Sequence, residues 1–248
     1  MKIISLNLAG RDNFGQDFNQ RMMKIAQFID REQADVVCLQ EVSFYQVNSL
    51  VDKINAMLKT PYNFLESVMS EKFAYDEWSD NMKKKWSSGL IESDGRYLTD
   101  GLAILSKQVI KSHGVLELKS VPKDDRGRPD FRKRVAQNVE IDTGLKISNV
   151  HFASNDNAYM QLQELICTSD ERLIVGDFNM TKKMMHKYKN IWGKGFNEST
   201  EYFDYLSHQK DGVAYDHLLL PKAYRFISIR VVDGLSDHSA VIYEIQNC

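Results

Sequence analysis

Short apolar runs recur from one end of this 248-residue chain to the other. The run Asp35–Gln40 (DVVCLQ) is apolar without alternation, which is typical of a strand buried on both faces. Before it, Lys2–Leu8 reads as a strand, and Asn19–Gln33 carries apolar residues at helical spacing. After it, Phe44–Leu58 reads as a second amphipathic helix. The chain therefore opens as strand–helix–strand–helix, which predicts an α/β fold.

Strands dominate the rest of the chain. Helices are expected at Asn157–Ser169 and Thr181–Asn190, the second with Thr181 as its N-cap, and Gly193–Leu206 reads as a loop. No repeat or composition break divides the sequence, so we expect one domain over residues 1–248. This many strands predicts a four-layer α/β sandwich of two mostly antiparallel sheets packed face to face, with helices outside. The further strands are expected at Tyr62–Val68, Leu98–Ser106, Val109–Leu118, Arg134–Ile141, Leu145–Phe152, Arg172–Gly176, Tyr215–Leu220, Tyr224–Val232 and Ser239–Ile245.

Two polar stretches interrupt this pattern. Ser70–Tyr97 is a long insertion with dispersed aromatic residues, and two interpretations stay open: a segment that gates a substrate site, or a solvent-exposed excursion. A third interpretation has Trp78 and Trp86 contacting a membrane interface. Val121–Lys133 is a charged turn region whose basic residues are most simply explained as solvated. Arg134, at a strand start, is the basic residue that we expect to point into a site.

Composition limits the classes of protein that fit. The formal net charge is −2, which lacks the strong basic excess typical of proteins held on nucleic acid by phosphate contacts. The three cysteines are widely spaced, which argues against a disulfide framework or a cysteine metal site. No stretch resembles a signal peptide or a membrane span, so a cytoplasmic protein without an integral membrane segment is expected. The oligomeric state stays open, with a monomer as the default.

Polar residues stand where the expected strands end. Each has an ordinary explanation as a turn residue, a helix cap or a satisfied histidine. Together, however, several carboxylates, amides and histidines are costly to bury unless they pair or bind a cation. Mg²⁺ prefers oxygen ligands and uses one or two carboxylates, and Mn²⁺ favours the same ligands. The residues are Asn7, Glu41, His151, Asp177, Asn179, Asp216, Asp237 and His238.

These residues lie in motifs that resemble those of the endonuclease/exonuclease/phosphatase superfamily. LQE, GDFN and SDH are specific in combination, and all the motifs follow the family's order over nearly the whole chain. They are SLNLAG with Asn7, LQEV with Glu41, DGLAILSK with Asp100, NVHF with His151, VGDFN with Asp177 and Asn179, AYDHLLL with Asp216, and SDHSAV with Asp237 and His238.

The resemblance implies a role for each residue in a magnesium-dependent phosphoesterase. Glu41 is implied as the main metal carboxylate, with Asn7 and Asp237 as further ligands or close partners. His238, held by Asp216, is implied to contact the scissile phosphate or to activate water. For the remaining residues, Asp177 is implied to position or deprotonate the attacking water, Asn179 to bind a phosphate oxygen, and His151 to act as a second histidine paired with Asp100.

The expected substrate is a phosphate ester, with a nucleic-acid phosphodiester first and a small-molecule or lipid-headgroup ester second. Ala9 stands where many abasic-site enzymes of the family carry an aspartate, which argues against that branch. His151 resembles instead the deoxyribonuclease, sphingomyelinase and tyrosyl-DNA phosphodiesterase branches. A binding scaffold without catalysis is the rival from another class. Because such scaffolds usually lose a metal carboxylate or the final histidine, the presence of Glu41 and His238 favours the enzyme.

Overall fold

The strands form two sheets of six in a computed structural model that describes residues 1–9, 18–44, 50–68, 99–119, 134–154, 156–168 and 171–248. Within each sheet, one strand pair is parallel, β1–β2 in the first and β7–β8 in the second, and the others are antiparallel. The first sheet has the order β11 (Tyr224–Val232), β12 (Ala240–Asn247), β1 (Lys2–Asn7), β2 (Val36–Phe44), β4 (Thr99–Ser106), β3 (Asn63–Val68). The second has the order β5 (Ile110–Glu117), β6 (Val135–Ile141), β7 (Lys146–His151), β8 (Leu173–Asp177), β10 (Asp216–Pro221), β9 (Phe196–Glu198).

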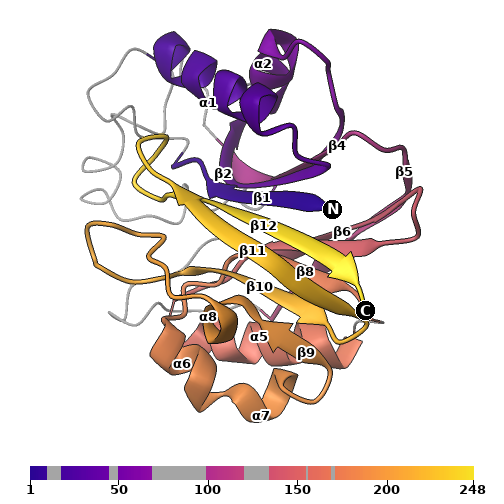
Figure 1. Ribbon diagram of the computed structural model, residues 1–248, viewed down its shortest axis with the longest axis vertical. Coiled ribbons are helices and arrows are strands. Elements are labelled where there is room, and N and C mark those ends of the chain that lie inside the picture. The colour runs from indigo at the N-terminus through magenta and orange to yellow at the C-terminus, as the bar shows by residue number, and fades with distance from the viewer. Residues whose placement is uncertain (10–17, 45–49, 69–98, 120–133, 155, 169–170) are drawn as a thin grey trace.

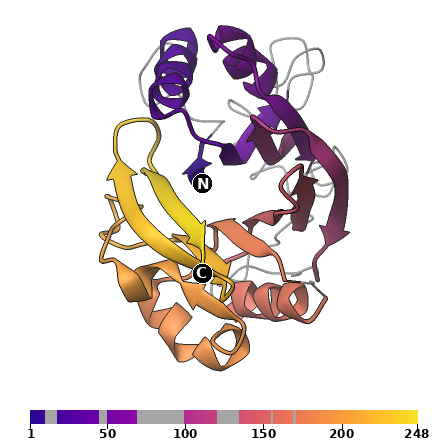
Figure 2. The same cartoon turned by 45° about the vertical axis from the view of Figure 1, so that its right-hand side comes forward.

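Helices lie on the outer side of each sheet, which makes four layers (Figures 1 and 2). The predicted four-layer α/β sandwich is therefore confirmed. No described helix is long and apolar enough to cross a membrane. The first sheet is covered by α1 (Phe18–Glu32) and α2 (Leu50–Met57), and the second by α5 (Asp156–Thr168), α6 (Lys182–Lys187), α7 (Lys189–Trp192) and α8 (Ser199–Tyr202).

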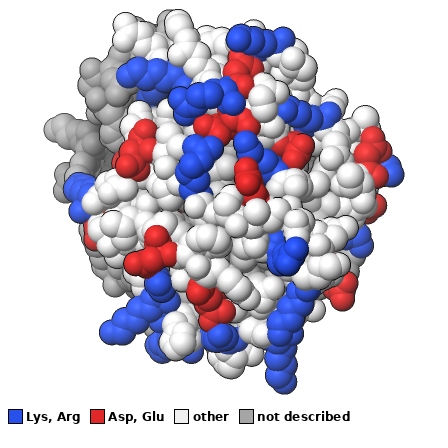
Figure 3. All heavy atoms as spheres, in the orientation of Figure 1, with Lys and Arg blue, Asp and Glu red and all other residues white. Residues whose placement is uncertain are grey.

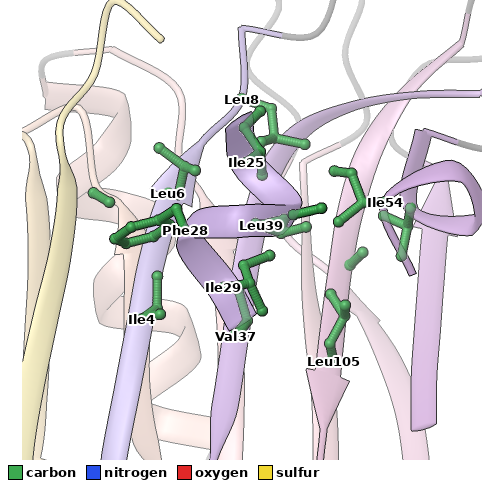
Figure 4. Close-up of a cluster of buried hydrophobic side chains, with 14 of the residues drawn as sticks. Ile4, Leu6, Leu8, Ile25, Phe28, Ile29, Val37, Leu39, Ile54 and Leu105 are labelled. Atoms are coloured by element: carbon green, nitrogen blue, oxygen red, sulfur yellow. The ribbon is translucent and has the colours of Figure 1, made fainter. Parts of the chain in front are cut away.

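Strand β2 shows why its sequence is apolar without alternation. Val37 and Leu39 face the helix layer, where they pack with Ile25 and Ile29 of α1 (Figure 4). The alternate side chains of β2, including Cys38, belong to the core between the two sheets. Because both faces of the strand are covered, neither set of positions tolerates polar residues until the strand approaches its carboxyl end.

Three expected elements differ from the structure. The helix expected over Thr181–Asn190 is divided into α6 and α7, with Tyr188 as the C-cap of the first and the N-cap of the second. Within the helix expected over Phe44–Leu58, the described residues form α2, Leu50–Met57, while Phe44 still pairs with Thr99 in the sheet. The expected loop Gly193–Leu206 contains β9 and α8. These elements are only three and four residues long, so no hydrophobic period develops. The predictions for Ser70–Tyr97 and Val121–Lys133 lie outside the described residues.

Gly176, next to the end of β8, is required by close contact with β7. Its φ is +141°, and an added Cβ would lie 2.1 Å from the carbonyl oxygen of Val150. We expect Gly176→Ala to lower the free energy of unfolding by about 1–3 kcal/mol, because the strand must take up strain or move from its neighbour. Chemical denaturation measures this loss. Gly114→Ala is the control, since a Cβ there meets nothing within 4 Å, and equal stability of the two variants would contradict the explanation.

Candidate active site

The polar ends of strands from both sheets meet at one edge of the sandwich. Asn7 ends β1 and pairs in register with Gln40 of β2. In the second sheet, His151 ends β7 and Asp177 ends β8, and these two residues are direct partners in the parallel ladder. Asp216 opens β10 and is also paired with Asp177. The strand ladders alone therefore bring His151, Asp177 and Asp216 side by side.

Two carboxylates share the same nitrogen neighbours. The Nδ2 of Asn7 donates to Oδ2 of Asp177 at 3.0 Å and to Oε1 of Glu41 at 3.4 Å. The Nε2 of His151 lies 3.6 Å from Asp177 Oδ2 and 3.9 Å from Glu41 Oε1. The Asp177 carboxylate is almost fully buried, whereas the Glu41 carboxylate is 25% exposed. The two carboxylates therefore converge at the point where the site opens to solvent.

The direction of the Glu41 side chain depends on an irregular backbone. The pairing of β2 with β4 shifts between Leu39 and Val42, and Glu41 has a φ of +49°. Ala9 and Asn179 also have positive φ, at +43° and +51°. Residues other than glycine seldom adopt this conformation, and such strain gathers at functional sites. The shifted pairing turns Glu41 toward Asn7 and His151.

Burial sets the charge properties of Asp177. Removal from water and the neighbouring carboxylate of Asp216 raise its pKa to about 6, against the lowering effects of His238, Asn179 and Asn7. Its Oδ1 accepts a hydrogen bond from the backbone N–H of Asn179 at 2.8 Å. The side chain of Asn179 donates in turn to the carbonyl oxygen of Phe152 at 2.8 Å. Asp177 is thus a fixed carboxylate that titrates close to neutral pH.

His238 and Asp216 form a buried dyad. The Nδ1 of His238 lies 2.8 Å from Oδ2 of Asp216, and its Nε2 lies 3.7 Å from Oδ2 of Asp177. Burial lowers the pKa of His238, but the carboxylates of Asp216 and Asp177 outweigh it and raise the pKa to about 10. Since the carboxylate accepts at Nδ1, the imidazole keeps its proton there. Because the raised pKa keeps the ring protonated at neutral pH, Nε2 also carries a proton and is an N–H donor.

The other predicted metal ligands, Asn7 and Asp237, and the predicted partner of His151, Asp100, differ in what they contact. Asn7 uses its Oδ1 to accept from the backbone N–H of Ala9 at 2.9 Å, so its amide nitrogen faces the carboxylates, and its role as a metal ligand stays a prediction. Asp237 is exposed, and its charge contributes to the raised pKa of its neighbour His238. Asp100 is paired with Ser43 in the β4–β2 ladder, while its side chain lies outside the described part of the structure.

The structure adds residues that the sequence did not single out. Ser236 Oγ donates to the carbonyl oxygen of Asn7 at 2.6 Å and accepts from the N–H of His238 at 2.9 Å. Ser236 belongs to the SDH motif, so the motif was a signal for it. The ring of His208 lies edge-on to His238, with centroids 4.9 Å apart, and no motif marks it. Arg134 is buried and donates to the carbonyl oxygen of His151 at 3.2 Å, so it supports the backbone of this site residue.

The donor set suits a hard cation such as Mg²⁺. Among the described residues, no group of three or more His, Cys, Asp or Glu side chains is arranged as a ready metal cluster. Mg²⁺ does not require one, because it commonly binds through one or two carboxylates and keeps several waters. Glu41 and Asp177 offer two such carboxylates at a partly exposed position. The raised pKa of Asp177 is the mark of a carboxylate that a cation would stabilise.

Comparison with known proteins gives a consistent result. A family model described as "Endonuclease/Exonuclease/phosphatase family" matches residues 4–238. No curated protein matches the sequence. A solved endonuclease/exonuclease/phosphatase from Beutenbergia cavernae DSM 12333 is similar with a TM-score of 0.71 at 14% identity, over 100% of this chain and 71% of that chain.

Two further solved structures carry more specific descriptions. The human Nocturnin catalytic domain with bound sulfate anion has a TM-score of 0.67 at 16% identity, over 100% of this chain and 93% of that chain. The Bacteroides thetaiotaomicron mannosyl-6-phosphatase Bt3783 has a TM-score of 0.64 at 16% identity, over 99% of each chain. At such low identities the likeness establishes the fold and leaves the substrate open.

Proposed function

The chain belongs to the endonuclease/exonuclease/phosphatase family, and from this premise we propose that it hydrolyses a phosphate ester with water as the nucleophile. Members of this family are generally hydrolases of phosphate esters. The observation that carries the proposal is the contrast between Asp177 and His238, whose facing atoms are 3.7 Å apart. The pKa of Asp177 is raised to about 6 and that of His238 to about 10, so a base and an acid coexist at neutral pH.

Each group then has one task. Asp177, ionised at neutral pH, orients the attacking water and takes its proton. His238, protonated and held by Asp216, donates from Nε2 to the ester oxygen of the phosphate, where negative charge develops in the transition state. As water bonds to phosphorus and the ester P–O bond breaks, this oxygen takes the Nε2 proton and leaves as an alcohol. The second histidine, His151, provides another ring nitrogen 3.6 Å from the same oxygen of Asp177. Asn179 is assigned to a phosphate oxygen, and Asp100 to support of His151.

The proposed cofactor is Mg²⁺, with Mn²⁺ as the alternative. Glu41 is assigned as its main ligand, with Asn7 and Asp237 as further candidates. When bound, the ion would supply positive charge to the phosphate oxygens. Asn7 and His151 are the nitrogen neighbours of the Glu41 and Asp177 carboxylates.

A nucleic-acid phosphodiester is the substrate class that we propose first. The presence of His151, which resembles the deoxyribonuclease-like branches, supports it. On the face shown in Figure 3, basic and acidic side chains of the described residues are interspersed and form no continuous basic track. Recognition would therefore depend on a few contacts near the scissile phosphate. A sugar phosphate monoester is the second candidate, favoured by the whole-length likeness to the Bacteroides thetaiotaomicron mannosyl-6-phosphatase.

A substrate panel tests the proposal and separates these classes. Purified protein is incubated with Mg²⁺ or with chelator against plasmid DNA, single-stranded RNA, an abasic duplex, a 5′-phosphotyrosyl oligonucleotide, mannose 6-phosphate, inositol phosphates and sphingomyelin. Cleavage that needs the metal and is lost in Asp177→Asn is expected for one class. Hydrolysis that persists in chelator or in Asp177→Asn would contradict the assigned chemistry. Tight substrate binding without turnover under any divalent ion would favour the scaffold interpretation.

Glu41→Gln tests the metal assignment. The change keeps the shape and the carbonyl oxygen of the side chain but removes its charge, so we expect the Mg²⁺ concentration for half-maximal activity to rise about tenfold or more. Activity measured over a magnesium titration gives this value, and thermal unfolding confirms that the variant is folded. Glu66→Gln, on β3, is the control. An unchanged magnesium requirement in Glu41→Gln would remove Glu41 from the metal site.

A further inference from the structure

The His238–Asp216 dyad joins the two sheets of the sandwich. Asp216 opens β10 in the second sheet, whereas His238 lies just before β12 in the first. These strands are not neighbours in either sheet, so no strand ladder sets the 2.8 Å separation of Nδ1 and Oδ2. The apolar core between the sheets and hydrogen bonds outside the ladders hold the two backbones at this distance.

Ser207 provides such bonds to both sides. Its hydroxyl oxygen accepts from the backbone N–H groups of Tyr215 at 2.9 Å and Asp216 at 3.0 Å. Its own carbonyl oxygen accepts from the N–H of Ser239 at 2.7 Å. The side chain of Ser207 is fully buried, so water cannot replace these contacts. One residue therefore fixes the backbone at Asp216 and the backbone next to His238.

Residues around Ser207 strengthen the link. His208 forms an isolated antiparallel bridge with His238, and its N–H donates to the carbonyl oxygen of Val213 at 2.9 Å. Segment 206–215 is thereby folded back on itself and placed against the loop that carries His238. Other hydrogen bonds act at one side of the dyad or are longer: the Tyr205 hydroxyl donates to the carbonyl oxygen of Asp216 at 2.8 Å, and Ser236 holds His238. Tyr243 of β12 also reaches the Asp216 carbonyl oxygen, at 3.5 Å.

We infer that Ser207 is a positioning residue that sets the distance and orientation of the His238–Asp216 hydrogen bond across the two sheets. The inference rests on the proposed function, because the dyad is assigned to the hydrolytic reaction. Ser207 acts through the backbone, and its hydroxyl oxygen accepts from two amides that occupy its lone pairs, so it is not a nucleophile. Loss of the hydroxyl leaves two buried N–H groups without their acceptor and releases one end of the dyad.

Ser207→Ala is the first test, with two measurements. We expect kcat to fall about 10- to 100-fold with little change in KM, because small displacements of a catalytic group have effects of this size. We also expect the downfield proton resonance of His238 Nδ1–H, assigned by its absence in His238→Ala, to shift upfield and to exchange faster with water. The resonance reports the dyad directly and does not depend on knowing the natural substrate.

Ser106→Ala is the matched control. Ser106 is also fully buried, and its hydroxyl oxygen accepts from the backbone N–H of Gln108 at 3.0 Å, at the end of β4 away from Asp100. We expect this variant to lose stability while kcat and the His238 resonance stay unchanged. Ser207→Cys is the second variant, since a thiol keeps most of the volume but accepts hydrogen bonds weakly. It is expected to show the same changes as Ser207→Ala and serves if the alanine variant does not fold.

The two measurements separate the possible failures. A folded Ser207 variant with wild-type kcat and an unchanged His238 resonance would overturn the inference. So would a fall in kcat with an unchanged resonance, because the effect would then not pass through the dyad. If the wild-type protein hydrolyses no phosphate ester, the proposed function fails, while a shifted resonance in Ser207→Ala alone would still support Ser207 as the residue that positions the dyad.

Discussion

His238→Ala is expected to reduce kcat by about 100- to 10,000-fold while the protein stays folded. The substitution removes the N–H donor that faces Asp177 and with it the positive charge proposed to stabilise the developing charge on the phosphate. The fold is expected to survive because the ring lies at the edge of the sandwich, outside the apolar clusters that hold the layers together. Steady-state kinetics on the substrate identified by the panel measures the loss.

A second histidine variant controls for the loss of an imidazole as such. His113 is exposed on β5, and His113→Ala is expected to keep wild-type kinetics. Thermal unfolding of both variants checks the folded state. A His238→Ala variant that retains kcat within a few-fold of wild type would remove His238 from the mechanism and would leave Asp177 without its acid partner.

The strand-end residues of this site were predictable because they lie at the ends of regular strands, which the sequence pattern reveals. Asn7, Asp177 and Asp216 directly end or open strands whose apolar sequences are unmistakable. Once two sheets of this order form, the ladders bring those positions to one edge without further information. The family motifs supplied the expected catalytic and metal-binding role of each residue, which the pattern of apolar runs does not indicate.

The contacts between the sheets could not be predicted in the same way. Glu41 reaches the site through a shift in strand pairing and a positive φ, and its local sequence contains no glycine to mark that turn. Ser207 lies in a segment without hydrophobic period, and its contact with Ser239 forms only when the two sheets pack. Sequence patterns report the faces of single elements, whereas these contacts join separate elements.

A buried ion pair beside the site is expected to dominate the pH dependence of stability. His217 follows Asp216 in β10 and is fully buried. Its Nδ1 lies 2.8 Å from Glu198 Oε1, and its Nε2 lies 2.6 Å from the carbonyl oxygen of Met180. Both neighbours are acceptors, and a neutral imidazole has only one N–H, so His217 is an imidazolium. Burial lowers the pKa of His217, but Glu198 outweighs this and raises it.

The pKa shifts of both partners decide how the stability that the His217–Glu198 pair provides changes with pH. Burial raises the pKa of Glu198, but hydrogen bonds and the charge of His217 lower it overall. The stabilisation from Glu198 is thus present above its unfolded pKa and is lost as the pH falls through the lowered value. The stabilisation from His217 is present below its unfolded pKa, 6.5, and is lost as the pH rises through the raised value. The pair therefore contributes most between these limits.

Glu198→Gln is expected to lower the free energy of unfolding by about 3–5 kcal/mol near pH 6, because it leaves a buried histidine without its counter-charge. Without Glu198, burial lowers the pKa of His217 and only the Met180 carbonyl and the charge of Asp216 still raise it, so the pKa falls below its wild-type value. The variant is therefore expected to lose less stability than wild type as the pH rises. Urea unfolding between about pH 5 and pH 9 measures both slopes.

Glu201→Gln is the control for this variant, since Glu201 pairs with Lys189 at the surface. Such a pair contributes about 0–1 kcal/mol, and its loss is expected to leave the pH slope unchanged. If Glu198→Gln behaves like Glu201→Gln, His217 is neutral in the folded protein. A neutral ring has one N–H for two acceptors, so one of its two short contacts would have to lengthen. The slope therefore tests the protonation of a group that lies next to Asp216 and shares its strand.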